Sequence, residues 1–331
     1  MNPVVGLARR RGVGRTGRSQ GVLWRAAKTS RGAFGLVLSG AIVVLAAVGP
    51  LVSPHSATAF VAQPFAHPDA SNLLGGDILG RDVLSRVLNG GWVLLIMAFL
   101  ATVVGVGVGA MAGIVAAYVR GVGDGAIMRT VDVILAFPQL VFALLLVSVV
   151  GAKLWLIVVA VGISHAPQVA RVLRAAAMDV AERPFVKAME LNGVRARTIV
   201  WREMLPNLTT PVTVEFGLRL TYSIVVMAGL AFLGFGQAPP APNWGYMISE
   251  NRIGLVENPW AVVVPALLIA LLTVGVNMFG DAVARVSMGA AGRKGELAVA
   301  STSIGAMEPP AFLSADGPHS LQPAARNDVP G

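Results

Sequence analysis

Six uncharged and strongly apolar runs constrain the fold of this sequence more than any other feature. They are Gly32 to Pro54, Gly90 to Val119, Val133 to Ala152, Leu154 to Ala170, Leu220 to Ser249 and Asn258 to Gly280. Each is close to or above the roughly 20 residues that a helix needs to cross the hydrocarbon core of a membrane. The composition agrees, because 55% of the residues are hydrophobic and only 13% are charged, whereas a soluble domain is about 25% charged. We therefore expect an all-α integral membrane protein with six transmembrane helices.

The lysines and arginines between these runs predict the orientation of the chain. With the N-terminus inside, twenty of them lie in the cytoplasmic segments and four lie in the external ones. Since cytoplasmic loops carry an excess of Lys and Arg, this distribution predicts that both termini are cytoplasmic (N-in, C-in). The net charge of +9 then reflects topology and attraction to anionic membrane lipid. No basic groove with interleaved aromatic residues indicates a nucleic-acid partner.

The runs and the segments between them predict five parts. These are a basic cytoplasmic tail (1–33), the first transmembrane helix (34–53), an extracytoplasmic loop with an interfacial helix (54–91), a five-helix core (92–288) and a disordered cytoplasmic tail (289–331). The arginine-rich start is similar to a twin-arginine signal, but the apolar run behind it is long and has no convincing cleavage site. A retained, largely disordered tail is therefore favoured. The last segment is rich in Ala, Ser, Pro and Gly, which is typical of a disordered tail.

A charged helix-turn-helix, Glu182 to Asn207, lies between the fourth and fifth runs. Pro184 suits the first turn of a helix, and Asn192 with Gly193 can take the left-handed conformation at a helix end. These signals predict one helix over 184–191. A second piece carries three arginines and must end or kink at Pro206, because proline cannot continue a helix without distortion. Such a charged excursion is expected to be a docking element.

The residues of this excursion carry a family resemblance. Ala188, Gly193, Ile199 and Leu205-Pro206 fall on the pattern of the EAA loop, which permeases of bacterial ABC importers present to their ATPase subunits. The Glu that gives this loop its name is Lys187 here, and Glu190 can partly replace the lost carboxylate. The resemblance implies that residues 176–206 form a cytoplasmic coupling segment between spans four and five.

The coupling segment supplies all the site residues that we predict. The ATPase-docking residues are Phe185, Ala188, Met189, Glu190, Gly193, Arg195, Arg197, Ile199, Leu205 and Pro206. The arginines, with Arg202, are expected to steer docking. Phe185, Met189 and Ile199 are expected to supply the apolar contacts to the ATPase.

Further matches extend the resemblance over roughly residues 73 to 285. The run Leu79-Gly-Arg-Asp-Val-Leu-Ser-Arg86 resembles the oligopeptide, dipeptide and nickel type of these permeases, and later motifs resemble their second, C-type subunit. For the helix over 83–88, an interfacial anchor and a wall of the external mouth are both open. The resemblance implies a bacterial inner-membrane protein, paired with a homologous permease, two ATPase subunits and an extracytoplasmic binding protein. It also implies alternating access, with ATP and Mg²⁺ bound by the partners and no cofactor bound by this chain.

Other residues receive plainer interpretations. Gly105, Gly109 and Gly113 share one helix face, which favours close helix packing over a pore role. Local ion pairs are favoured over proton relays for Asp132 and Asp281, and an ion pair is favoured over a substrate site for Glu215 and Arg219. The pairs are Arg129 with Asp132, Asp281 with Arg285, and Glu215 with Arg219.

Several functional classes lack the residues that they need. The sequence has no cysteine, its four histidines have no metal-ligand spacing, and neither a phosphate-binding loop nor a nucleophile motif occurs. We therefore expect a non-catalytic subunit without a metal site. The alternative from another class is a self-sufficient secondary transporter driven by an ion gradient, which would need internal repeats and a midplane ion site. Neither the residues that bind the transported solute nor its identity follow from the sequence.

Overall fold

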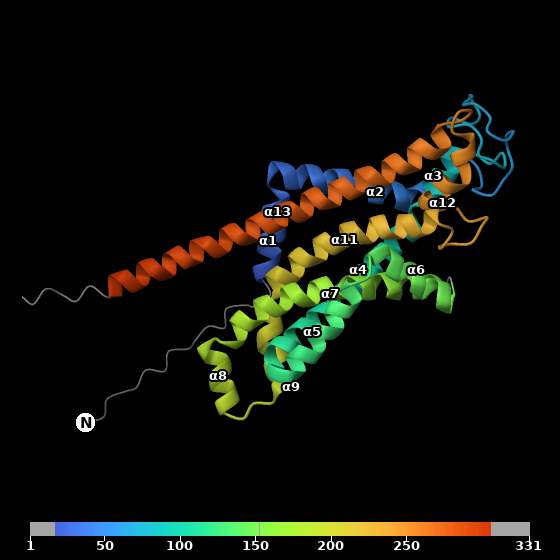
Figure 1. The fold of residues 1–331 in the computed structure, drawn as a ribbon. Coiled ribbons are helices and arrows are strands. Elements are labelled where there is room, and N and C mark those ends of the chain that lie inside the picture. Colours follow the sequence, from blue (N-terminus) through green and yellow to red (C-terminus); the bar gives the residue numbers. More distant parts are fainter. Residues whose placement is uncertain (1–16, 152, 306–331) are drawn as a thin grey trace, which may run out of the picture. The chain divides into compact units, whose positions relative to one another are not determined.

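The computed structural model describes residues 17–305 except residue 152, and every named element among them is a helix. The elements are α1 (Gly17–Ala27), α2 (Ser30–Val52), α3 (Val83–Gly90), α4 (Trp92–Val119), α5 (Gly121–Leu135), α6 (Gln139–Val150), α7 (Leu154–Ala181), α8 (Pro184–Leu191), α9 (Ala196–Thr198), a π-helix (Ile199–Met204), α10 (Leu205–Asn207), α11 (Thr209–Phe232), α12 (Trp244–Asn251), a 3₁₀ turn (Arg252–Gly254) and α13 (Trp260–Gly305). The chain divides into units of residues 1–287 and 288–331. The description below concerns the first unit (Figure 1).

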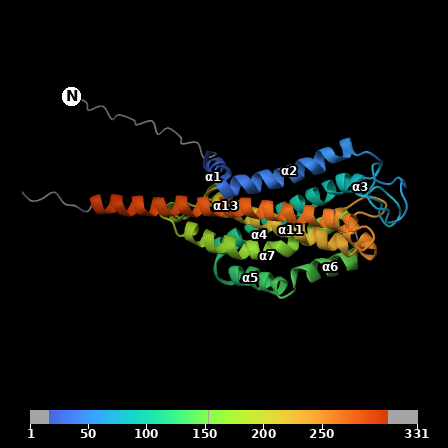
Figure 2. The same ribbon diagram turned by 90° about the horizontal axis from the view of Figure 1, so that it is seen from above.

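Five helical segments are long and apolar enough to cross a membrane. They are Ser30–Val52, Val83–Val119, Leu154–Ala181, Thr209–Phe232 and Trp260–Met288. A sixth candidate is the pair α5 and α6, which meets the same test only when both are taken together and is bent by 89°. The all-helical membrane fold is therefore confirmed, and six spans are reached if the bent pair is one of them (Figure 2).

Two of the predicted spans differ from the structure. The third run was expected to be one helix over 133–152, but the chain breaks at Ala136 to Pro138. The break follows from Pro138, which has no amide hydrogen and disfavours a helical residue before it. The fifth span begins at Thr209 and ends at Phe232, instead of covering 220–249. Its start was missed because Glu215 and Arg219 count as charges in a search for uncharged runs, although they pair with each other at 3.1 Å.

Helices α4 and α7 form the closest packed pair of the bundle. The predicted glycine face is responsible, because Gly105, Gly109 and Gly113 all lie against the backbone of α7. A Cβ built on Gly109 would lie 2.4 Å from the carbonyl oxygen of Ala166, a distance that no side chain tolerates. The packing interpretation of these glycines is therefore confirmed, and the two helices approach as closely as their backbones allow.

The segments on either side of α3 and α12 fold into a compact cap at the end of the bundle where these two helices meet (Figure 1). Arg81 and Arg86 are fully buried there, and both donate to the carboxylate of Glu250, at 2.6 and 2.9 Å. Asp77 accepts from Arg81 Nε at 2.6 Å. Buried charges require such pairing, since an unpaired one costs several kcal/mol. The indole of Trp244 closes the cap by donating to the Val87 carbonyl at 2.7 Å.

Helix α3 belongs to this cap. Its expected apolar face consisted of Val83, Leu84, Val87 and Leu88, of which Leu84 is half-buried and the other three are buried within the chain. Arg86 on the same helix is buried as well. The helix is confirmed, but its apolar face packs on the protein itself.

The two tails differ from their predicted disorder. Residues 17–27 form helix α1, and Ala26 of this helix packs against Ala282 and Val283 of α13. Helix α13 continues to Gly305, beyond the expected boundary at 289. The rest of both predicted tails, residues 1–16 and 306–331, lies outside the described residues.

Candidate functional site

The first half of the coupling segment is a short helix with defined ends. Pro184 is at the first helical position of α8, as predicted, and the helix ends at Leu191. Gly193 then takes a φ of +70°. The amide of Val194 donates to the Met189 carbonyl and that of Gly193 to the Glu190 carbonyl, both at 3.0 Å. This pair of hydrogen bonds is the Schellman motif, which requires a left-handed residue at the position of the glycine.

The second half is wound more loosely than an α-helix. Residues Ile199–Met204 form a π-helix, in which the amide of Leu205 donates to the carbonyl of Val200, five residues earlier. Pro206 explains this widening, because its ring would collide with the carbonyl of Arg202 in a regular helix. The predicted distortion at Pro206 is thus confirmed as a π-helix followed by the short helix α10.

The inner face of the segment packs against the chain's own bundle. Ile199, Met204 and Val186 are fully buried, in a cluster with residues of α4 and α7. The members contributed by those two helices are Val106, Ala110, Ile114, Ala117, Val169, Leu173, Ala177, Val180 and Ala181. Complete burial of a side chain such as Ile199 or Met204 contributes about 1.5–3 kcal/mol each. The segment is therefore firmly attached to α4 and α7.

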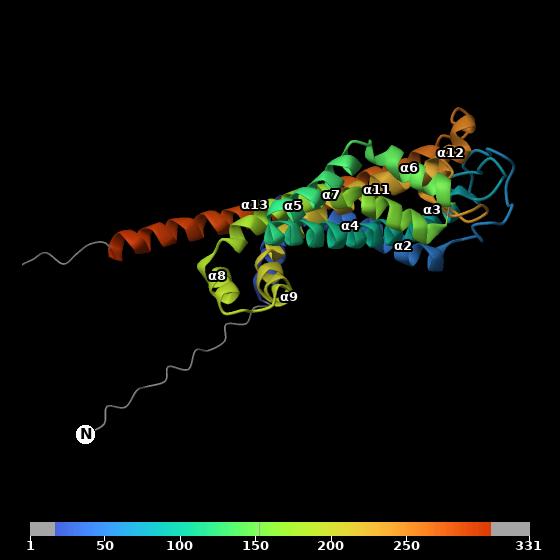
Figure 3. The same ribbon diagram turned by 60° about the horizontal axis from the view of Figure 1, so that its bottom comes forward.

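The outer face carries most of the predicted docking residues. Figure 3 shows α8 and α9 standing away from the end of the α7 axis. The exposed residues of the predicted set are Phe185, Ala188, Glu190, Gly193, Arg195, Arg197 and Pro206, while Met189 and Leu205 are half-buried. The remaining one, Ile199, is buried in the bundle. Its side chain packs in the cluster with α4 and α7, and its docking role stays a prediction.

Two exposed apolar side chains on the outer face were not predicted. Leu191 is 89% exposed and Trp201 is 49% exposed. Leu191 could have been found from the helical pattern, because it lies off the face that Val186 and Met189 define. The exposure of Trp201 could not have been found in this way, because the π-helix changes the helical period and so the face on which Trp201 lies.

Glu190 links the coupling segment to the end of α4. Its carboxylate interacts with the hydroxyl of Tyr118. Lys187, at the place of the usual glutamate, is exposed. Glu190 therefore contacts the chain's own bundle, and its replacement of the lost carboxylate stays a prediction.

Two ion pairs join α5 to α7, the helix that leads into the coupling segment. Arg174 Nε donates to Asp124 Oδ1 at 2.6 Å, and Arg171 donates to Asp132 Oδ1 at 2.6 Å. The second pair corrects the expected local pair of Asp132 with Arg129. Asp281 and Arg285, which are both described, form no ion pair in the structure, whereas the expected pair of Glu215 and Arg219 is confirmed.

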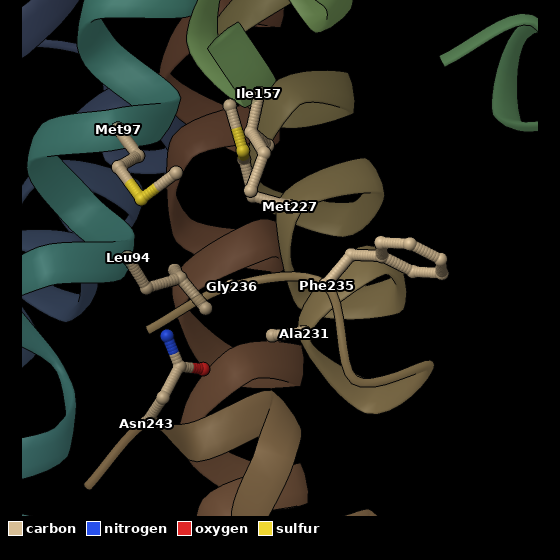
Figure 4. Close-up of a pocket in the computed structure, with 8 residues that line it drawn as sticks. All are labelled: Leu94, Met97, Ile157, Met227, Ala231, Phe235, Gly236 and Asn243. Atoms are coloured by element: carbon tan, nitrogen blue, oxygen red, sulfur yellow. The ribbon is translucent and has the colours of Figure 1, made fainter. Parts of the chain in front are cut away.

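A small apolar cavity lies at the opposite, cap end of the bundle (Figure 4). Its volume is only about 10 Å³, close to the least that one water molecule needs, and its lining comes from α4, α7, α11 and the loop before α12. The lining residues are Leu94, Met97, Ile157, Met227, Ala231, Phe235, Gly236 and Asn243. Asn243, the polar member, already accepts from the Gly245 amide at 3.0 Å as the cap of α12. This cavity offers no charged group to a solute.

Comparisons with known proteins converge on one family. Residues 105–286, which include the whole coupling segment, match the model of the family described as binding-protein-dependent transport system inner membrane component. The chain is similar to the glutathione transport system permease protein GsiD of Pectobacterium atrosepticum, with 35% identity over 65% of this chain and 71% of the relative. It is 33% identical to GsiD of Escherichia coli over 72% of this chain and 80% of the relative. It is 30% identical to the dipeptide transport system permease protein DppC of Alkalihalophilus pseudofirmus over 78% of this chain and 87% of the relative.

Proposed function

Because the chain belongs to the family of binding-protein-dependent transport system inner membrane components and is a multi-pass permease subunit of an ABC importer, we propose that it carries short peptides inward by alternating access. Its partners would be a homologous permease, two ATPase subunits that bind ATP and Mg²⁺, and an extracytoplasmic binding protein. Both termini and the coupling segment would face the cytoplasm. The peptide cargo rests on relatives whose names specify glutathione and dipeptides.

The observation that carries the proposal is the division of the coupling segment into two faces. One face, with Ile199 and Met204, is buried against α4 and α7. The other exposes Leu191 and Trp201 together with several arginines. A segment that is packed on the bundle on one side and exposes apolar and basic side chains on the other suits a contact through which a partner subunit moves the bundle.

The motion would then pass through parts that are already joined. Helices α4 and α7 are held together at the glycine face, and α5 is tied to α7 by the two ion pairs of Arg171 and Arg174. When the ATPase subunits close on ATP, these helices would move together with the coupling segment. Such rigid-body motion between two states is the expected basis of alternating access.

Reconstitution in proteoliposomes tests this function. The complete transporter with its binding protein should accumulate a labelled dipeptide only when ATP is supplied, and this chain alone should neither hydrolyse ATP nor accumulate the dipeptide. Uptake by this chain alone, driven by a proton or sodium gradient, would instead establish the secondary transporter.

A further inference from the structure

Arg219 is a charged residue in the middle of a span. It lies in α11 (Thr209–Phe232), which is long and apolar enough to cross the membrane. Its side chain is 13% exposed. A charge at this depth is costly in lipid, so such residues normally face the bundle interior or a water-filled cavity. Arg219 therefore needs a reason beyond packing.

Three groups fix the orientation of its guanidinium. Nε donates to Glu215 at 3.1 Å, Nη1 donates to the Gln168 side-chain oxygen at 3.4 Å, and the Tyr222 ring lies 5.3 Å below. Nη2 donates no hydrogen bond to any residue in the described part of the chain. Tyr222 is 52% exposed. The guanidinium is thus held in place with one donor edge unused, next to a side chain at the surface of the subunit.

A second polar contact continues from the same face of α7. Gln139 Nε2 lies 2.5 Å from His165 Nδ1 and 3.3 Å from Ser164 Oγ. Ser164 and His165 are four and three residues before Gln168, so each of them lies about one helical turn from Gln168. Gln139, His165, Gln168 and Arg219 therefore form one polar row across α6, α7 and α11.

The break between α5 and α6 adjoins this row. Gln139 is the first residue of α6 and follows Pro138 directly, and Ala136, Phe137 and Pro138 are exposed. Backbone outside a helix at membrane depth is tolerated only where it is buried in protein or lines water. An exposed break next to a polar row is expected where solute and water pass.

We infer that this polar row is a carboxylate-binding wall of the translocation pathway, with Arg219 as the group that binds the C-terminal carboxylate of a peptide in transit. The inference rests on the proposed function as a peptide importer. An arginine with a free edge suits this ligand, because N–H donors of a guanidinium match a carboxylate in charge and geometry. Glu215 partly neutralises Arg219, which keeps the binding weak enough for release, as a pathway requires.

The test compares a dipeptide with its C-terminal amide in the complete transporter. Both probes are supplied at concentrations that saturate the binding protein, so that its preference for one of them does not affect the uptake rates. The ratio of dipeptide uptake to dipeptide-amide uptake is then measured within each variant. Arg219→Gln should lower this ratio about tenfold, because a charge-assisted hydrogen bond is lost, and Arg219→Lys should give an intermediate ratio. Because the ratio is internal, differences in the amount of assembled transporter do not affect it.

Two further variants sharpen the test. Glu215→Gln removes the competing carboxylate and should raise the ratio. Arg252→Gln, which changes an exposed arginine bonded to Ser249, should leave it unchanged. If the wild type imports dipeptide with ATP but all variants keep its ratio, the carboxylate site is refuted and the proposed function stands. If the wild type imports neither probe, peptide import fails, and the assignment of Arg219 fails with it.

Discussion

Gly193 decides how the two halves of the coupling segment are joined. Its φ of +70° closes the Schellman motif, and a Cβ at this position would meet no atom within 4 Å. The Cβ itself therefore meets no steric obstacle, and the positive φ is the main cost of a substitution here.

We expect Gly193→Val to weaken ATPase association and to abolish uptake, while the protein still inserts and pairs with the homologous permease. A β-branched residue at positive φ costs about 1–3 kcal/mol, which misplaces α8 relative to the π-helix. Copurification of the ATPase subunits measures the effect. Gly193→Asn is the control, because asparagine tolerates the left-handed region and should retain most association. Wild-type copurification and transport in the valine variant would remove this turn from the mechanism.

The docking residues show what the sequence could predict at the level of single side chains. Pro184 and Gly193 act through local backbone rules, and both were placed correctly. The burial of Ile199 did not follow from the motif, because a motif identifies a position but not the direction of its side chain. That direction depends on the space between α4 and α7, which residues near Ile199 in the sequence do not determine.

At the scale of elements, the helix pair α4 and α7 is the part of the bundle on which the coupling segment packs. The pair depends on glycines whose missing side chains allow backbone contact. A matched test exists on the same helix, because Gly107 has no atom within 4 Å of a built Cβ.

Gly109→Ala should lower the thermal stability of the detergent-solubilised protein, and Gly107→Ala should leave it unchanged or slightly raised. The first adds a methyl group 2.4 Å from the Ala166 carbonyl, and overpacking of this kind costs about 1–3 kcal/mol. The second gains helix propensity without a clash. Equal melting temperatures for the two variants would contradict the packing of α4 on α7.

The broken span shows why some elements could not be predicted. Asp124 and Asp132 interrupt the apolar pattern of α5, and their partners Arg174 and Arg171 lie on α7. Only the folded structure brings these pairs together, so the sequence placed the third span after Asp132. Ser30–Val52, whose one charged residue, Arg31, lies at its start, was predicted to within a few residues.

At the scale of the whole molecule, the account requires that the coupling segment and the cap lie on opposite sides of the membrane. The chain has no cysteine, so single cysteines can be labelled without background. Ala188→Cys, at an exposed position of α8, should react with an impermeant maleimide only from the cytoplasm. Val256→Cys, at a position that is 96% exposed, should react only from outside. Labelling of both from the same side would refute the proposed topology.

The central claim is that the outer face of the coupling segment contacts an ATPase subunit, and photocrosslinking tests it most directly. A photoreactive amino acid is placed at Leu191, which is 89% exposed, or at Val256 as the control, in the complete transporter. We expect irradiation to join the ATPase subunit to the chain from position 191 and not from position 256. An intact complex that gives no ATPase adduct from position 191, or equal adducts from both positions, would contradict the account.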